Sequence, residues 1–244
     1  MLKHQKKFFN KISDTYHQNS SRYQESYKSL RKETVGQIKG NVLDIGNGGT
    51  IGYSIKNAKT LTLADISEVI LKNPRISIGK KFMPLVHKKL KCVVADVMSL
   101  PFRKNQFDTV IIISTIHHLS EKSLNISKIN IIKAFSEINR VLKNDGTFII
   151  LECHPNIILK FIQDLTFPFS YKILEYFGKP QPYFLSKNQI LNIIKQYDFS
   201  ITKDVRIPSG KKVYVPLFPS ISPSGKLWDR LIESRLYIFK KVWK

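Results

Sequence analysis

Cysteine is scarce in this sequence, and long apolar runs are absent. The 244 residues contain two cysteines, Cys92 and Cys153, which show no paired spacing. This excludes a disulfide framework and a thiolate zinc site, and it indicates a reducing compartment. No apolar stretch approaches the length of a membrane-spanning helix. The basic first eleven residues lack the apolar core of a secretory signal, so we expect a cytoplasmic protein.

Acidic residues and arginine are also few. Eighteen Asp and Glu stand against 40 Lys and Arg, which gives a net charge of +22. Only eight of the 40 are Arg, the residue best suited to bind phosphate through two hydrogen bonds. Lysine in excess beside abundant Ile and Asn is what an AT-rich genome encodes, and we favour that explanation. The alternative is a surface for nucleic acid or for an anionic membrane.

What the sequence has is a regular alternation of strand and helix patterns from residue 41 onward. Hydrophobic residues make up 42% of the chain, enough for a sizeable core. The alternation predicts an α/β fold with a parallel sheet. We expect strands at 41–45, 60–65, 91–95, 107–113, 146–152, 199–207 and 235–243, with the last two paired antiparallel. Helices are expected at 128–143, ended by Asn144-Asp145-Gly146, at 187–197, capped by Ser186, and near 226–234 after a loop at 208–225.

Two segments lie outside this alternation. Residues 1–40 are polar and helical in pattern, with aromatic residues at three-to-four spacing, among them Tyr16 and Tyr23. They predict either a helical pair packed on the domain edge or a lid that binds substrate. Residues 155–185 are rich in aromatic and aliphatic side chains and are interrupted by prolines. They form a substrate cover or, over 155–177, an interfacial helix that contacts membrane.

Three carboxylates stand at the ends of three successive predicted strands. Asp44 precedes a glycine turn that contains Gly46 and Gly48, and Asp65 and Asp96 end the next two strands. Ligands bind outside the carboxyl ends of parallel strands, where glycines let them approach the backbone. A carboxylate about twenty residues beyond such a turn suits a ribose. The apolar residues after Asp96 suit an adenine ring.

As a set, these motifs resemble the class I S-adenosylmethionine-dependent methyltransferases of the small-molecule type, related to quinone and sterol methylases. The resemblance covers about 42–152. It rests on the glycine turn of 42–49, on Asp65, and on the segments 95–102, 107–111 and 138–147. It implies a Rossmann-like, doubly wound sheet of seven strands, mostly parallel with the last strand antiparallel. The methyltransferase domain would span 41–244, with 1–40 as the amino-terminal helical lid.

The resemblance also implies a cofactor, S-adenosyl-L-methionine, and a set of residues that bind it. Asp44 would hold its ammonium group, directly or through water, and the glycine turn would admit its methionine portion. Asp65 would bind the ribose and Asp96 the adenine. The complete implied set is Asp44, Gly46, Asn47, Gly48, Asp65, Ile66, Asp96, Val97 and Ser114. Thr50 departs from the family, which often has a third glycine there, and Ile51 stands where a dinucleotide-binding turn needs glycine.

Histidines supply the candidates for chemistry. By analogy with the family, His117 and His118 face the methyl group, and either could bind or deprotonate an acceptor. The alternative is that they cap a helix or bond the loop. His154 is a candidate for substrate binding. Glu152 and these three histidines lack the spacing of a metal site, so no metal is predicted.

We therefore expect an enzyme that methylates oxygen or carbon on a small apolar or aromatic metabolite. One alternative is an RNA methyltransferase that uses the basic surface. Another is a catalytically silent binding subunit that keeps the fold. The sequence does not indicate the oligomeric state or name the acceptor.

Overall fold

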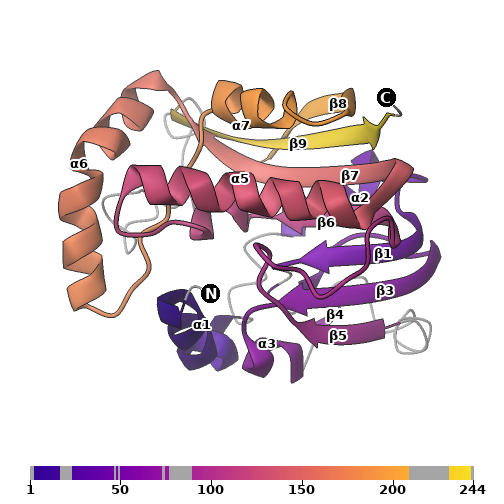
Figure 1. Cartoon of the computed structure of the whole chain (residues 1–244), viewed down its shortest axis with the longest axis horizontal. Helices are drawn as coiled ribbons and strands as arrows, with labels where there is room; N and C mark the ends of the chain where they lie inside the picture. Colours follow the sequence, from indigo (N-terminus) through magenta and orange to yellow (C-terminus); the bar gives the residue numbers. More distant parts are fainter. Residues whose placement is uncertain are drawn as a thin grey trace.

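A seven-stranded sheet organises the molecule (Figure 1). The computed structural model describes residues 3–16, 24–46, 48, 50–72, 75–76, 90–208 and 231–242. The sheet has the order β5-β3-β1-β6-β7-β9-β8. Its strands are β1 (Lys39–Ile45), β3 (Asn57–Asp65), β5 (Leu90–Val94), β6 (Phe107–Ile113), β7 (Leu142–Pro155), β8 (Phe199–Ile207) and β9 (Ile232–Lys241).

Strand directions confirm the predicted topology. Strands β5, β3, β1, β6 and β7 pair parallel with their neighbours. Only β9 runs antiparallel, to β7 on one side and to β8 on the other. The strand order reverses at β1, and ligands bind at such a switch point in an open parallel sheet.

The helices complete the fold. They are α1 (Lys3–Tyr16), α2 (Gln24–Glu33), α3 (Glu68–Lys72), α5 (Leu124–Val141), α6 (Ile157–Tyr176) and α7 (Lys187–Ile194), with the 3₁₀ turn η3 (Ile116–His118). A second, two-stranded sheet pairs β2 (Thr50–Ile51) with β4 (Arg75–Ile76). The sequence did not predict these two short strands. Thr50 lies in β2, where it pairs with Arg75, and not in the glycine turn. No helix in the described ranges is both long and apolar enough to cross a bilayer.

Both faces of the sheet are buried at its centre, which explains the continuous apolar runs of β1, β3, β6 and β7. The edge strands β5 and β8 are largely exposed or half-buried. Phe148 and Ile150 belong to a core cluster shared with α5, whereas Ile149 belongs to a second cluster on the opposite face, shared with Leu30 of α2. Successive side chains of β7 thus supply two different cores, as the period of a strand requires.

Most predicted boundaries agree with the structure, and the differences have local causes. The strands at 107–113 and 199–207 have the predicted ends. The helix predicted at 128–143 runs from Leu124 to Val141, because Ser123 caps it one turn earlier. The Asn144-Asp145-Gly146 turn does not end that helix; it lies inside β7, where the pairing register with β6 shifts. Asp145 takes a positive φ of 58° there.

The carboxyl-terminal predictions are confirmed in part. Ser186 caps α7 in a capping box with Gln189, and α7 ends at Ile194, three residues before the predicted end. The strand predicted at 235–243 spans Ile232–Lys241 and pairs antiparallel with β8. The loop predicted at 208–225 and the helix near 226–234 fall mostly outside the described residues.

The centre of β7 supplies a test of the core. Phe148 is fully buried and packs edge-on against Phe135, with ring centroids 5.9 Å apart. We expect Phe148→Ala to lower the free energy of unfolding by about 3–5 kcal/mol, because it leaves a cavity between sheet and α5. Urea unfolding followed by circular dichroism measures this. Ile129→Ala, at a half-exposed position of α5, should change it by less than about 1 kcal/mol.

Candidate functional site

An open pocket of about 630 Å³ lies at the carboxyl ends of the central strands. In Figure 1 the arrowheads of β1, β3 and β5 point toward α1 on that side of the sheet. The pocket is lined by Gln5, Phe9, Ile45, Gly46, Gly48, Ala64, Asp65, Ile66, Ile70, Ala95, Asp96, Val97, Ser114, Thr115, His118 and Leu119. The structure thus brings together seven of the nine predicted cofactor-binding residues.

The glycine turn forms one wall because its backbone needs glycine. Gly46 has a φ of +64° and Gly48 one of +61°, in the left-handed region that other residues avoid. A Cβ at Gly46 would collide with the side chain of Thr115. That threonine donates its hydroxyl to the Gly46 carbonyl at 3.0 Å, so the turn is fixed to the loop after β6. Bare backbone therefore faces the pocket at both glycines.

Asp65 places a buried carboxylate at the end of β3. Its Oδ1 accepts a hydrogen bond from the Ser67 amide at 2.8 Å, and its Oδ2 accepts one from the Gly48 amide at 3.2 Å. Burial raises the pKa of this carboxyl above its ordinary value, although these backbone amides act in the opposite direction. Burial disfavours the ionised form of this carboxyl, so hydroxyl groups of a ligand that donate hydrogen bonds to it would stabilise the carboxylate.

A braced loop after β5 carries Asp96 and Val97. Arg140 donates to the carbonyls of Leu100 at 2.9 Å and Phe102 at 2.7 Å, and it forms an ion pair with Glu137. Glu137 in turn accepts a hydrogen bond from the Leu100 amide at 2.7 Å. Two charged residues of α5 therefore hold the loop against the pocket, a role that sequence reasoning missed.

Helix α1 closes the pocket opposite the strand ends. Asn10 accepts a hydrogen bond from the hydroxyl of Ser67 at 2.6 Å, which fixes the helix beside Asp65. Phe9 packs edge-on against His118, with centroids 5.1 Å apart. The Oε1 of Gln5 and the Nδ1 of His118 are buried and have no hydrogen-bond partner among the described residues. Both atoms belong to residues that line the pocket, so a ligand can satisfy them.

His117 and Glu152 form a buried pair behind the pocket. Nδ1 of His117 lies 2.7 Å from Oε1 of Glu152, and the His117 ring stacks on Phe184 and lies 4.2 Å from the His118 ring. Because a carboxylate only accepts, Nδ1 carries the proton, and Nε2 has the lone pair when the ring is neutral. Glu152 also accepts hydrogen bonds from the amides of Ile116 and Cys153.

Burial and neighbouring charges shift the pKa values of His118 and Glu152. Burial lowers the pKa of His118 well below its ordinary value, and the neighbouring His117 lowers it further. His118 is therefore neutral at physiological pH and can offer or accept one hydrogen bond in the pocket. Burial acts to raise the pKa of Glu152, yet the charge and hydrogen bond of His117 bring it below its ordinary value, so Glu152 stays ionised.

Three predicted site residues do not reach the pocket wall. Asp44 is fully buried beneath the glycine turn and accepts a hydrogen bond from Tyr53 at 2.5 Å. His154 is used structurally: its Nδ1 bonds the Leu185 carbonyl at 2.8 Å, and its Nε2 bonds the Tyr237 hydroxyl at 2.9 Å. His154 is therefore not among the residues that line this pocket. His117 does not line the pocket itself, but its ring lies against that of His118, which does.

Other predicted site residues lie outside the described part of the chain. Asn47 and Tyr23, and the side chain of Tyr16, are not described. Burial, followed by the charge of Glu152, raises the pKa of Cys153 to about 12, which leaves no thiolate for nucleophilic attack. Within the described ranges, no three His, Cys, Asp or Glu side chains are placed to hold a metal ion.

Several residues that line the pocket were not predicted from the sequence. Gln5 and Phe9 lie four residues apart on α1, so they share one helix face, and this spacing could have indicated them. Thr115 follows Ser114 directly, but its bond to Gly46 depends on how β1 and β6 pair, which the sequence does not show. Tyr53, the partner of Asp44, carries no motif signal.

Comparison with known proteins gives a family match over the same part of the chain. The family model for the methyltransferase domain matches residues 43–150. The ubiquinone/menaquinone biosynthesis C-methyltransferase UbiE of Rickettsia bellii is 33% identical over 154 residues, which are 59% of this chain and 56% of that protein. The chain spans about half the length of the curated relatives that it matches.

Solved structures share the fold at low identity. The protein solved in complex with the Trm112 methyltransferase activator of Haloferax volcanii superposes with a TM-score of 0.65 at 15% identity, covering 96% of this chain and 98% of that one. Geranyl diphosphate C-methyltransferase of Streptomyces coelicolor, solved with S-adenosyl-L-homocysteine, gives a TM-score of 0.55 at 13% identity, covering 88% and 77%. These likenesses establish the fold.

The His117–Glu152 pair predicts a pH-dependent stability. A carboxyl whose pKa is lower in the folded than in the unfolded chain contributes stability above its unfolded pKa, and that contribution disappears as the pH falls through the folded pKa. For Glu152 the ordinary value is 4.5. We expect wild type to be more stable than Glu152→Gln at pH 7, with a difference that shrinks below pH 4.5. Urea unfolding from pH 7 to pH 3 measures it; a constant difference would contradict the ionised pair.

Proposed function

Because residues 43–150 form a methyltransferase domain of the class I, S-adenosylmethionine-dependent type, we propose that this protein methylates oxygen or carbon on a small apolar or aromatic acceptor. The observation that carries the proposal is one pocket in which the glycine turn, the Asp65 and Asp96 strand ends and His118 meet.

The residues of the pocket fit S-adenosyl-L-methionine. Asp65 offers a buried carboxylate to the ribose hydroxyls, and Ile66 and Val97 provide apolar walls beside Asp96 for the adenine. Gly46 and Gly48 line the pocket with bare backbone, where the amino-acid end would lie. Asp44 lies beneath this wall, so its contact with the ammonium group would need an intervening group such as water. Bound there, the cofactor would supply a methyl group activated by its sulfonium charge.

The task of the protein in this reaction is to orient the acceptor and exclude water. Holding two reactants in line can be worth about 7–11 kcal/mol of barrier. Phe9 and Leu119 line the pocket beside His118, and α1 forms one of its walls through Gln5 and Phe9. We assign acceptor binding to His118, whose neutral ring has a buried Nδ1 with no partner among the described residues.

His117 is our candidate for the general base. Glu152 fixes its ring through Nδ1, which leaves Nε2 to take up a proton from a hydroxyl or an acidic carbon by way of the adjacent His118, because His117 itself does not line the pocket. A base held by a carboxylate in this manner recurs in many enzymes that activate a nucleophile. Glu152 then stabilises the imidazolium that forms. A base is required only where the acceptor must lose a proton.

The apolar nature of the acceptor is supported by the surroundings and by relatives. Phe184 stacks on the face of the His117 ring at a centroid distance of 4.5 Å, so this histidine has aromatic surroundings. The names of the two methyltransferases compared above refer to quinone biosynthesis and to geranyl diphosphate, both built on apolar chains. Methylation of RNA and a silent binding role remain the competing functions, and each is an outcome of the experiments below.

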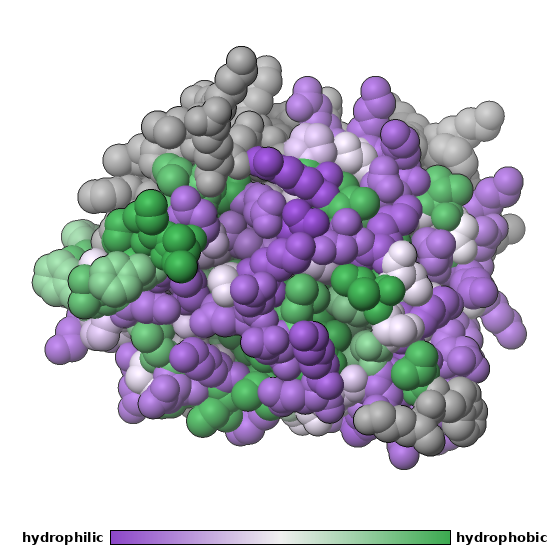
Figure 2. Space-filling view, turned by 90° about the horizontal axis from the view of Figure 1, so that it is seen from above, coloured by the Kyte–Doolittle hydropathy of each residue, from purple (hydrophilic) through white to green (hydrophobic). Residues whose placement is uncertain are grey.

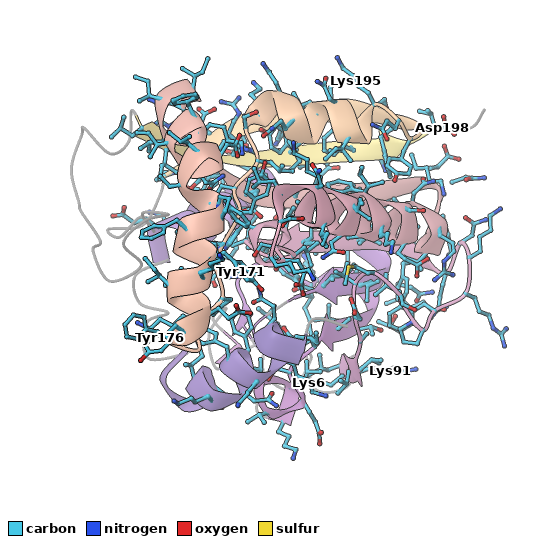
Figure 3. The ribbon with its side chains drawn as sticks, turned by 60° about the vertical axis from the view of Figure 1, so that its left-hand side comes forward. Lys6, Lys91, Tyr171, Tyr176, Lys195 and Asp198 are labelled. Atoms are coloured by element: carbon cyan, nitrogen blue, oxygen red, sulfur yellow. The ribbon has the colours of Figure 1, made fainter. Side chains whose placement is uncertain are left out.

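Cofactor binding is tested at Asp65. We expect Asp65→Asn to weaken S-adenosyl-L-methionine binding by at least about tenfold, because hydrogen bonds to a charged acceptor are worth about 1.5–3 kcal/mol. Isothermal titration calorimetry measures the affinity. Asp198→Asn makes the same chemical change at the far end of the molecule (Figure 3) and should bind as wild type. Equal affinity for wild type and Asp65→Asn would overturn the assignment, and no binding by wild type would favour the silent subunit.

Proton removal is tested at His117 with a labelled-methyl assay. Wild type is first screened with phenols, hydroquinones, prenyl lipids and RNA. With an acceptor that must lose a proton, we expect His117→Asn to lower kcat by about 10²–10⁴-fold. Its affinity for S-adenosyl-L-methionine, measured by calorimetry, should stay unchanged. An unchanged kcat would remove His117 as the base, and label transfer to RNA alone would favour the RNA methyltransferase.

A further inference from the structure

Helix α6 has its polar and apolar sides reversed for a surface helix. Such helices normally bury their apolar face and expose polar residues. In α6, three of the five buried residues are polar: Lys160, Gln163 and Ser170. The side turned to solvent carries large hydrophobic residues instead. We call this side the outer face of α6; it consists of Ile157, Ile158, Phe161, Leu165, Phe169, Ile173 and Tyr176, and Phe177 extends it at the carboxyl end.

The outer face is a concentrated patch rather than scattered exposure. Among the described residues, fifteen large hydrophobic side chains are exposed, and these eight are more than half of them. Phe161, Leu165 and Phe169 are 68–70% exposed and follow one another at intervals of four residues. Figure 2 shows hydrophobic residues gathered at the left-hand edge of the molecule, where Figure 1 places α6. A contiguous patch of this kind marks an interaction site.

The reversed pattern is stabilised by polar contacts on the inner side. Gln163 exchanges two hydrogen bonds with the backbone of Phe184, at 2.9 and 3.1 Å. Lys160 pairs with Asp164 at 2.6 Å and lies 4.0 Å above the ring of Tyr183. Because these contacts fix the rotation of the helix, the apolar residues cannot turn inward without breaking them. The outer face is therefore a fixed feature of the fold.

We propose that the outer face of α6 lies in the interface of an anionic lipid bilayer. A helix of 20 residues is about 30 Å long and can rest lengthwise in the headgroup region. Phe161, Phe169 and Phe177 are of the kind that interfacial helices bury among acyl chains, and Tyr176 has an apolar ring with a polar hydroxyl that suits the headgroup level. In Figure 3, Tyr176 points away from the body of the molecule, whereas Tyr171 lies on the side toward it.

Charge complementarity selects the anionic bilayer. Lys172 is exposed beside the outer face and Lys179 just beyond it, against one exposed acid there, Glu175. Long lysine side chains can reach past apolar contacts to phosphate. Helix α1 lies beside the carboxyl-terminal end of α6 in both Figure 1 and Figure 3, and its described side chains include Lys6, Lys7 and Lys11 but no acid. A second copy of this chain would bring +22 against +22, which disfavours a dimer through this face.

The position of α6 also suits delivery of an apolar molecule. Its inner side holds Phe184, and Phe184 stacks on His117 behind the pocket. Membrane contact and the candidate site thus share one structural element. The inference itself does not depend on methyl transfer, because lipid binding is measured without cofactor or acceptor.

Vesicle co-sedimentation tests the proposal on the full chain. Phosphatidylcholine vesicles are compared with vesicles that also contain phosphatidylglycerol, at low and at high salt. We expect wild type to sediment with the anionic vesicles and less so at high salt. The double variant Phe161→Gln/Phe169→Gln should bind them at least about tenfold more weakly, because two aromatic side chains no longer enter the interface.

A matched control separates this effect from a general loss of exposed apolar surface. Ile129→Gln/Ile201→Gln removes two hydrophobic residues that are about half exposed on α5 and β8. This variant should bind vesicles as wild type does. Unchanged far-ultraviolet circular dichroism and thermal midpoint in both double variants confirm that each is folded.

Three results would overturn the proposal. The first is that wild type does not sediment with anionic vesicles. The second is that the outer-face variant binds them as tightly as wild type, which would mean that lysines alone cause the binding. Alternatively, analytical ultracentrifugation could show a wild-type dimer that Phe161→Gln/Phe169→Gln dissociates, which would assign the face to a second copy. The proposal is supported if wild type and the control variant sediment with anionic vesicles and only the outer-face variant loses this binding.

Discussion

One buried carboxylate, that of Glu152 at the end of β7, determines the shape of the candidate site. It accepts hydrogen bonds from the amides of Ile116 and Cys153 and from the ring of His117. These bonds fix the loop after β6. Thr115 of that loop then holds the Gly46 carbonyl, so the order imposed by Glu152 reaches the glycine turn of β1. Leaving such a carboxylate buried without these donors would cost several kcal/mol. The hydrogen bonds of Glu152 therefore stabilise both the pocket and the carboxyl ends of the strands that form it.

A second chain of contacts joins the amino-terminal helix to the same edge. Asp65 accepts from the Ser67 amide, and the Ser67 hydroxyl donates to Asn10 of α1. The helix that closes the pocket is thus attached at the residue proposed to bind ribose. Because polar groups buried in a low-dielectric site need partners, a ligand that satisfies Gln5 and His118 would also stabilise α1 in place.

The sequence was sufficient for the fold and for much of the pocket. Strand periodicity and the resemblance to class I methyltransferases predicted the sheet, its antiparallel last strand, and seven lining residues. Those residues follow directly from strand ends, which a local pattern identifies. Features that depend on long-range packing could not be predicted. Tyr53 meets Asp44 only because the segment after β1 folds back, and His154 is enclosed by Tyr237 of a strand 83 residues later. Neither contact leaves a local signal.

For helix α6, the buried and exposed residues of the structure distinguish between roles that its sequence periodicity leaves open. Its sequence is apolar on most sides, which is compatible with a substrate cover, a core helix or an interfacial helix. The structure separates these because it turns Lys160 and Gln163 inward and leaves Phe161 and Phe169 in solvent. A cover packed on the domain would bury Phe161 and Phe169 and expose Lys160. Folding in water alone gives no reason for the opposite arrangement, since exposed apolar area costs about 25 cal/mol per Å². An apolar surface outside the molecule does give a reason, and it accounts for the patch without invoking any change in the fold.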